Sequence, residues 1–136
     1  MDKKFDVVIV GTGAAGLYAA LNFPESVNIL LVSKRELQLS NSSLAQGGVA
    51  CVLDTVHDSY KLHITDTLIA GKYKNTLSAV EKLVTEGPSD VLKIKDLGVD
   101  FDLNEDGTMC KTLEAGHSRN RIVHHKDSTG KAIVDG

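Results

Sequence analysis

The chain has 136 residues, which is the length of one domain and leaves little room for a second. Apolar residues make up 42% and charged residues 24%, as in ordinary soluble domains, and the net charge is −3. Nucleic-acid-binding proteins usually have a basic excess, so this balance argues against a nucleic-acid partner. Cys51 and Cys110 form no CxxC pair, which disfavours a disulfide scaffold or a cysteine-based zinc site and fits a reducing cytoplasm.

The most apolar stretch gives no indication of a membrane partner. It covers residues 7–21, contains three glycines and is shorter than the roughly 20 residues of a membrane span. It also lacks the cleavage-like end of a secretory signal peptide. We therefore expect a cytoplasmic location.

The beginning of the chain is patterned as strand, helix and strand. The β-branched run at residues 5–10 is typical of a strand that is buried on both faces. Residues 17–22 predict a short helix, and residues 27–32 predict a second buried strand. This order within about 30 residues predicts a βαβ unit with parallel strands and a right-handed crossover, as in a Rossmann-like α/β fold.

The next part of the chain is predicted to alternate between loops and helices. Residues 33–48 read as a long functional loop, and residues 49–53 as a short strand. Three helices are expected further on, at residues 58–69, 77–85 and 88–97, with Asp58 or Ser59 available to cap the first of them. His63 lies in an apolar stripe of the first helix, where a satisfied helix residue is the favoured interpretation.

The last part of the chain carries weaker signals. Residues 99–101 alternate like a short strand, and residues 104–107 form a turn signal. Residues 109–130 are predicted to be irregular. Residues 131–136 read as the middle of an apolar helix or strand without a cap, so we expect a fold that is incomplete at the C-terminus.

Gly11, Gly13 and Gly16 form the pattern GxGxxG between the first strand and the first helix. In this setting the first glycine permits a tight turn, the second lets the backbone approach a pyrophosphate, and the third allows close packing of helix on strand. The helix N-terminus offers N–H groups and a positive dipole end to the anion. The pattern predicts a dinucleotide site; the alternative is a plain tight turn.

The residues after the second strand leave the choice of dinucleotide open. An NAD or ordinary FAD site usually has Asp or Glu there to hold the ribose hydroxyls. This chain has Ser33 and Lys34 instead. A lysine at this place can neutralise a phosphate or donate to the ribose, so binding is retained but a simple NAD site is less favoured.

Further motifs resemble a known group of flavoproteins. Residues 41–50 (NSSLAQGGVA), taken with the glycine motif, resemble the succinate dehydrogenase, fumarate reductase and L-aspartate oxidase superfamily, in which an AQGG loop wraps FAD. Four later segments resemble the L-aspartate oxidase family in the same order: residues 66–71 (DTLIAG), 114–118 (EAGHS), 121–124 (RIVH) and 127–130 (DSTG).

The resemblance implies a Rossmann-like FAD-binding domain and its cofactor contacts. Asn41 stands where covalently flavinylated relatives have a histidine, and an amide cannot form that bond, so the FAD is expected to be noncovalent. No metal site is expected. The implied FAD contacts are Gly11, Thr12, Gly13, Ala14, Ala15, Gly16, Ser33, Lys34, Asn41, Ser42, Ser43, Leu44, Ala45, Gln46, Gly47 and Gly48.

Glu114 is the residue that the resemblance assigns to the substrate. In the L-aspartate oxidase family the matching acid lies near the substrate ammonium, and a carboxylate facing an ammonium favours amino-acid substrates. A solvated loop acid is the alternative. Ala115 departs from the family pattern, which has a second glycine, and it would strain the loop if that position had a positive φ.

The implied function is oxidation of L-aspartate to iminoaspartate, with oxygen or fumarate as the electron acceptor. The product would enter quinolinate and NAD synthesis, with quinolinate synthase as a partner. Residues 1–136 would be the N-terminal part of an FAD-binding domain without its capping domain, so we expect no turnover and weak FAD binding from this chain alone. The alternatives are a fumarate reductase or succinate dehydrogenase flavoprotein with noncovalent FAD, and an inactive nucleotide-binding remnant.

Overall fold

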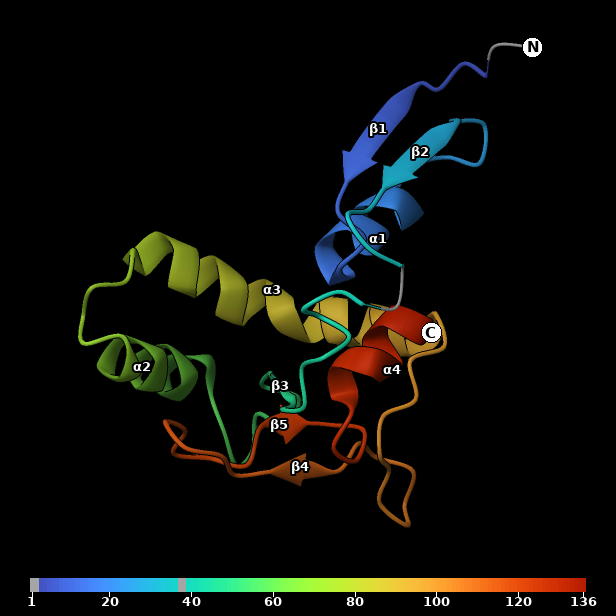
Figure 1. Cartoon of the computed structure of the whole chain (residues 1–136). Helices are drawn as coiled ribbons and strands as arrows, with labels where there is room; N and C mark the ends of the chain where they lie inside the picture. The colour runs from blue at the N-terminus through green and yellow to red at the C-terminus, as the bar shows by residue number, and fades with distance from the viewer. Residues whose placement is uncertain (1–2, 37–38) are drawn as a thin grey trace.

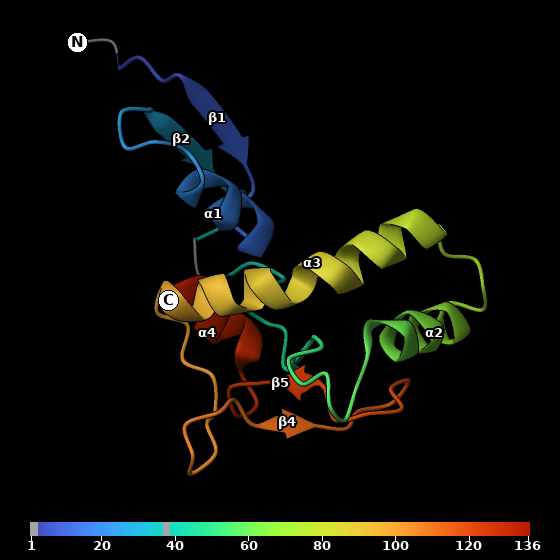
Figure 2. The same ribbon diagram turned by 180° about the vertical axis from the view of Figure 1, so that it is seen from behind.

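The computed structural model describes residues 3–36 and 39–136, so residues 37 and 38 of the predicted 33–48 loop lie outside the described part. A small parallel sheet with one helix projects from a larger part built of helices and a second sheet (Figure 1). The view from behind shows the same division (Figure 2).

The first part of the chain forms the predicted βαβ unit. Strand β1 is Val7–Val10, helix α1 is Ala14–Leu21, and strand β2 is Ile29–Val32. The strands are parallel, with Val7 opposite Ile29 and Val10 opposite Val32. Parallel pairing is therefore confirmed, while the helix begins three residues before the predicted start.

One face of this sheet is not covered by the described residues. Helix α1 lies on one side of the sheet, where Val7 and Ile9 are half-buried. On the other side, 57% of Val8 and 82% of Val10 remain exposed. Parallel sheets are normally covered on both faces, so this part of the chain has an apolar surface of the kind that further structure covers.

A second, antiparallel sheet was not predicted in full. Its strands are β3 (Val49–Ala50), β4 (Lys111–Thr112) and β5 (Ile122–Val123), with β5 in the centre. The prediction of an irregular segment at residues 109–130 is therefore wrong. The strand expected at residues 49–53 is only two residues long.

The helices α2 (Tyr60–Ala70) and α3 (Leu77–Asp96) lie side by side. Ser59 caps α2 by accepting the N–H of Leu62 at 3.2 Å. The two helices predicted at residues 77–85 and 88–97 are a single helix that contains Pro88. Proline removes one backbone hydrogen bond, but Pro88 is buried in the same apolar face as other α3 side chains, and this packing keeps the helix continuous. The other buried residues of α3 are Val80, Val84 and Val91.

The main core lies between α3, the second sheet and the last helix, α4 (Thr129–Asp135). Residues 99–101 are not a strand, although Val99 and Phe101 are buried in this core, and the predicted turn at residues 104–107 is present. The buried residues of the core are Cys51, Val91, Val99, Phe101, Met109 and Val123. Among the described residues, no helix has the length and apolar character that crossing a bilayer requires.

Candidate functional site

The glycine motif forms a tight turn between β1 and α1. Gly11 has a φ of +110°, which favours glycine, and its N–H donates to the carbonyl of Val32 at 2.8 Å. A Cβ at Gly16 would overlap the carbonyl oxygen of Gly11 and lie 3.5 Å from the Ile9 side chain. The backbone conformation of the turn therefore requires the first glycine, and the close contact between α1 and β1 requires the third.

The N-terminus of α1 faces the loop that follows β2. Gly13 is the N-cap and makes no side-chain cap, and the N–H of Ala14 donates to Ser42 Oγ at 3.1 Å. A Cβ at Gly13 would come within 2.9 Å of the same oxygen. The N–H groups of Ala15 and Gly16 belong to the first helical turn, which has no helical acceptor for them. The geometry and the dipole make this end of α1 suitable for an anion.

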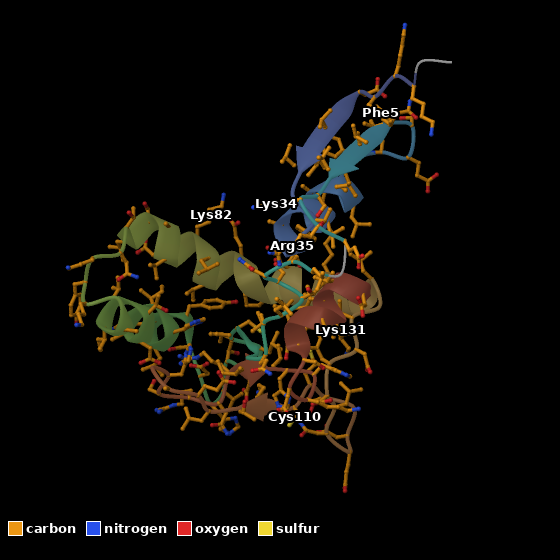
Figure 3. All side chains as sticks on the ribbon, viewed as in Figure 1. Phe5, Lys34, Arg35, Lys82, Cys110 and Lys131 are labelled. Atoms are coloured by element: carbon orange, nitrogen blue, oxygen red, sulfur yellow. The ribbon has the colours of Figure 1, made fainter. Side chains whose placement is uncertain are left out.

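The end of β2 is tied to the glycine turn by hydroxyl groups. Thr12 is 5% exposed, and its Oγ1 donates to Ser33 Oγ at 3.1 Å. The Ser33 hydroxyl also accepts the N–H of Arg35 at 3.3 Å. Lys34 and Arg35 are exposed beside α1 (Figure 3). Ser33 therefore stabilises this turn, and both Ser33 and Lys34 are accessible to a ligand.

A groove joins the glycine turn to the later AQGG segment. Its volume is about 190 Å³. Complete ligand pockets have roughly 300–1,000 Å³, so the described residues form only part of a site. Residues from both motifs and from α4 line the groove: Ala14, Ser42, Ala45, Gly47, Gly48, Val49, Thr129, Gly130 and Ile133.

Other residues of the 41–48 segment lie outside this groove. Asn41, Leu44 and Gln46 are exposed and do not line it. Ser43 stabilises the local turn, since its Oγ donates to the carbonyl of Ser40 at 2.8 Å. The structure thus brings Ser42, Ala45, Gly47 and Gly48 to the α1 turn, but not the whole segment.

The two glycines of the AQGG segment have different surroundings. A Cβ at Gly48 would collide with the Ile122 side chain and lie 2.5 Å from the carbonyl oxygen of Val123, so packing against β5 accounts for this glycine. A Cβ at Gly47 would have only Glu114 Oε2 nearby, at 3.9 Å. Gly47 is therefore the position where a ligand can approach the backbone.

Glu114 lies in the loop between β4 and β5 and is exposed. Its carboxylate is brought to Gly47, although 67 positions separate the two residues in the sequence numbering. The positive φ in this loop belongs to Gly116, at +85°, and Ala115 is not among the non-glycine residues with positive φ. The condition under which Ala115 would strain the loop, a positive φ at this position, is therefore not met.

Comparison with known proteins identifies the family of this chain. The FAD binding domain family matches residues 6–136. The chain belongs to this family.

Several relatives are similar over nearly the whole chain. The L-aspartate oxidase of Clostridium perfringens is 47% identical over 135 residues, which are 99% of this chain and 30% of that protein. The L-aspartate oxidase of Acinetobacter baylyi is 47% identical over 95% of this chain and 24% of its own length. A solved structure of E. coli quinol fumarate reductase has a TM-score of 0.89 and 28% identity over 96% of this chain and 23% of its own. The expected resemblance and FAD as the cofactor are confirmed, and the chain spans less than a third of these relatives.

The groove has the features that FAD requires. The pyrophosphate of a dinucleotide needs close approach to backbone N–H groups, and the start of α1 offers them without a side chain at Gly13. Gly47 also lines the groove, and it leaves its backbone open to a ligand. The residues present therefore fit a flavin dinucleotide, of which this groove would hold a part.

The loop that carries Glu114 is held by a buried ionic network, which the sequence reasoning missed. Arg121 is 0% exposed; its Nε and Nη2 donate to Asp58 at 2.8 and 2.7 Å, and its Nη1 donates to Asp66 at 2.6 Å. Burial opposes ionisation of Asp58 and Asp66, but hydrogen bonds from Arg121 and from neighbouring N–H groups outweigh it and hold the pKa of both carboxyls below the usual value. In the sequence, only the motifs at residues 66–71 and 121–124, which begin with Asp66 and Arg121, pointed to these residues.

His63 does not have the satisfied environment that the sequence predicts. It is 6% exposed, its Nδ1 has no hydrogen-bond partner among the described residues, and its ring lies 5.6 Å from that of His117. Burial, with the Arg121 charge nearby, lowers the pKa of His63 from 6.5 to about 4.

The low pKa of His63 predicts that the chain loses stability in acid. The unfolded chain takes up a proton at His63 near pH 6.5, whereas the folded chain does so only near pH 4. The unfolded state therefore gains protons first as the pH falls through this window. We expect the free energy of unfolding to fall by roughly 3 kcal/mol through this group, measured by urea denaturation at several pH values. His63→Gln cannot titrate and should have a shallower slope; an unchanged slope would contradict the assignment.

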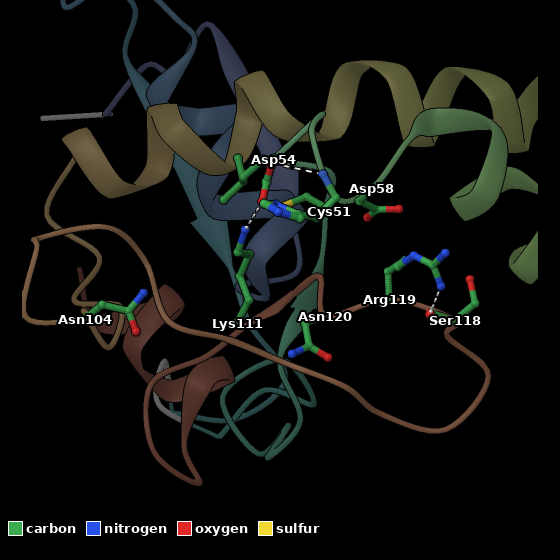
Figure 4. Close-up of a pocket in the computed structure, with 10 residues that line it drawn as sticks. Cys51, Asp54, Asp58, Asn104, Lys111, Ser118, Arg119 and Asn120 are labelled. Atoms are coloured by element: carbon green, nitrogen blue, oxygen red, sulfur yellow. Dashed lines mark hydrogen bonds and ion pairs between the residues drawn. The ribbon is translucent and has the colours of Figure 1, made fainter.

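A larger polar cavity lies on another part of the molecule (Figure 4). Its volume is about 400 Å³, and Glu114 and the glycine turn do not line it. Lys111 Nζ reaches Asp54 at 3.5 Å, and Arg119 donates to the carbonyl of Ser118. Within the described residues, no group of three or more His, Cys, Asp or Glu is arranged to hold a metal ion.

Proposed function

We propose that this chain is the FAD-binding part of an enzyme that oxidises L-aspartate to iminoaspartate. The observation that supports it best is the position of Glu114. Its Oε2 lies 3.9 Å from the place that a Cβ would occupy if Gly47 had a side chain. A carboxylate beside Gly47, which lines the groove, is suited to a substrate that carries an ammonium group. The identity of 47% to L-aspartate oxidases supports the same substrate.

The chain's residues would divide the work of binding. The first turn of α1 would hold the diphosphate, Ser33 and Lys34 would lie at the adenosine side, and residues 41–48 would wrap the ribityl chain and flavin. Asn41 supports noncovalent attachment, because its amide cannot form the bond that a histidine makes in covalent relatives. Bound FAD supplies the hydride acceptor, and the protein supplies orientation and electrostatics. Glu114 would orient the substrate through its ammonium.

A chimera tests this proposal directly. The 135 residues of this chain that align with the Clostridium perfringens relative replace the matching segment of that protein. We expect the chimera to bind FAD and to oxidise L-aspartate. In it, Glu114→Gln should raise KM for L-aspartate by at least about tenfold, since one partner of an ion pair is removed. The affinity for succinate, which has no ammonium, should fall little.

Glu105→Gln is the matched control, because Glu105 is an exposed acid in the 104–107 turn, away from the groove. It should leave both ligands unaffected. Equal effects of Glu114→Gln on L-aspartate and succinate would contradict the assigned role of Glu114. A chimera that binds FAD but does not oxidise L-aspartate would contradict the proposed reaction.

A second candidate is a fumarate reductase or succinate dehydrogenase flavoprotein with noncovalent FAD, which the TM-score of 0.89 to E. coli quinol fumarate reductase favours. Reduction of the flavin by succinate in preference to L-aspartate would select it. An inactive nucleotide-binding remnant is the third candidate, and tighter binding of NAD or ADP than of FAD by this chain would select it.

The first proposal, oxidation of L-aspartate, has three further parts. They are oxygen or fumarate as the electron acceptor, entry of the product into NAD synthesis, and quinolinate synthase as a partner.

A further inference from the structure

We propose that Asp66 on α2 is a positioning residue for Glu114. Its carboxylate fixes the loop between β4 and β5 and thereby holds the Glu114 carboxylate beside Gly47. The inference rests on the proposed function, because it concerns how the ammonium contact is set, and it adds a residue that touches neither cofactor nor substrate.

The first step is the set of donors that meet at Asp66. Its Oδ2 accepts the N–H of Ser118 at 2.8 Å, the Oγ–H of Ser118 at 2.8 Å and Nη1 of Arg121 at 2.6 Å. The Asp66 side chain is 12% exposed, and its bond to Arg121 is partly buried, whereas Ser118 lies at the exposed side of the carboxylate. One carboxylate oxygen thus joins α2 to two points of the loop.

The second step is the short path from Ser118 to Glu114. The N–H of His117 donates to the carbonyl of Glu114 at 3.2 Å and closes a turn that ends next to Ser118. Gly116 has a φ of +85° in this turn, and a Cβ there would lie 3.8 Å from the Cβ of Ala70 on α2. The turn therefore lies against α2, and a shift at Ser118 moves the backbone of Glu114.

The third step is the base of the same loop. The antiparallel pairs of β4 and β5, with Thr112 opposite Ile122, fix where the loop leaves and rejoins the sheet. This ladder holds the two ends, but Glu114 is two residues beyond it. Asp66 supplies the additional attachment on the far side of Glu114. Three segments that the sequence resemblance had marked separately, at residues 66–71, 114–118 and 121–124, meet in this arrangement.

A purely structural role of Asp66 is the alternative, since it also neutralises buried Arg121. Asp58 provides the comparison, because it pairs with the same guanidinium through two hydrogen bonds, whereas the N–H and Oγ–H of Ser118 donate to Asp66. Asp66→Asn and Asp58→Asn each remove one negative charge from Arg121. Only the first weakens the attachment of Ser118.

The test uses the chimera described above, with the ligands L-aspartate and succinate. We expect Asp66→Asn to lower kcat/KM for L-aspartate by roughly 10–100-fold, as displaced contacts do. The dissociation constant of succinate, read from the flavin absorbance, should change by less than about threefold. Ser118→Ala, which removes one of the two Ser118 bonds and leaves Arg121 paired, should show a smaller change in the same direction.

Equal losses for L-aspartate and succinate in Asp66→Asn, matching those of Asp58→Asn, would overturn the inference. Hydrogen exchange in this 136-residue chain gives a second readout: the Ser118 amide should be protected, and Asp66→Asn, whose neutral amide oxygen is a weaker acceptor, should lower that protection while Asp58→Asn retains it. Unprotected Ser118 in the unsubstituted chain would also overturn it. A chimera that binds FAD without oxidising L-aspartate would count against the proposed function alone, because the exchange experiment does not depend on it.

Discussion

Arg121→Ala is expected to lower the free energy of unfolding by about 3–5 kcal/mol, the cost of leaving buried charges without a partner. Arg121 is 0% exposed, and the side chains of its partners Asp58 and Asp66 are 5% and 12% exposed. Without the guanidinium, two carboxylates would remain close together in a largely dry environment. Urea denaturation of the chain at pH 7 measures the loss.

The pH dependence of this loss separates charge from cavity effects. In Arg121→Ala the carboxyls can be neutralised by protonation, so the destabilisation should shrink between pH 7 and about pH 5, as their pKa values rise without the cation. Arg121→Lys keeps the charge but not the paired geometry with Asp58, and it should be less destabilised than the alanine variant. The same loss at both pH values would mean that lost packing, and not unpaired charge, is the cause.

The parts of the fold that depend on local pattern could be predicted from the sequence. The apolar runs of β1 and β2 and the glycines between them led to a parallel βαβ unit, and parallel pairing is present. Gly98, which directly follows the helix predicted to end at residue 97, has a φ of +118° just after α3. In these cases the residue type alone restricts the backbone, so no distant contact is needed.

The parts that depend on distant contacts could not be predicted. Strands β4 and β5 have two residues each, too few for a visible alternation, and they exist because β5 pairs both with the nearby β4 and with β3, more than 70 positions earlier. Pro88 reads as the first residue of a helix, but burial of its face keeps α3 continuous through it. The alternating residues 99–101 enter the core without a partner strand.

The candidate site shows the same limit. The resemblance implied that the glycine turn and residues 46–48 contact the same FAD, and Ala14, Gly47 and Gly48 line one groove, whereas Gln46 does not. Gly48 is needed for a different reason than the one expected, because β5 and not a ligand occupies the space that a side chain at this position would take. The network of Arg121 joins residues up to 63 positions apart, and neither its burial nor its partners can be read from spacing.

Gly16→Ala is expected to disturb both the βαβ unit and FAD binding. The new Cβ would overlap the carbonyl oxygen of Gly11 and lie 3.0 Å from its carbonyl carbon, so backbone must move, not a flexible side chain. Overpacking of this kind costs about 1–3 kcal/mol of stability. The same shift moves the start of α1 away from the position where its N–H groups meet a pyrophosphate. In the chimera, we expect the affinity for FAD, measured by quenching of flavin fluorescence, to fall by at least about tenfold.

Gly87→Ala is the matched control for this substitution. Gly87 lies inside α3, and a Cβ there would meet nothing within 4 Å. Alanine should therefore stabilise the helix by about 0.5–1 kcal/mol, because glycine loses more backbone freedom on folding. FAD affinity should not change, since α3 does not line the groove. If Gly16→Ala left FAD affinity unchanged while lowering stability, close packing of α1 on β1 would be needed for the fold alone, and the pyrophosphate would not depend on the start of α1.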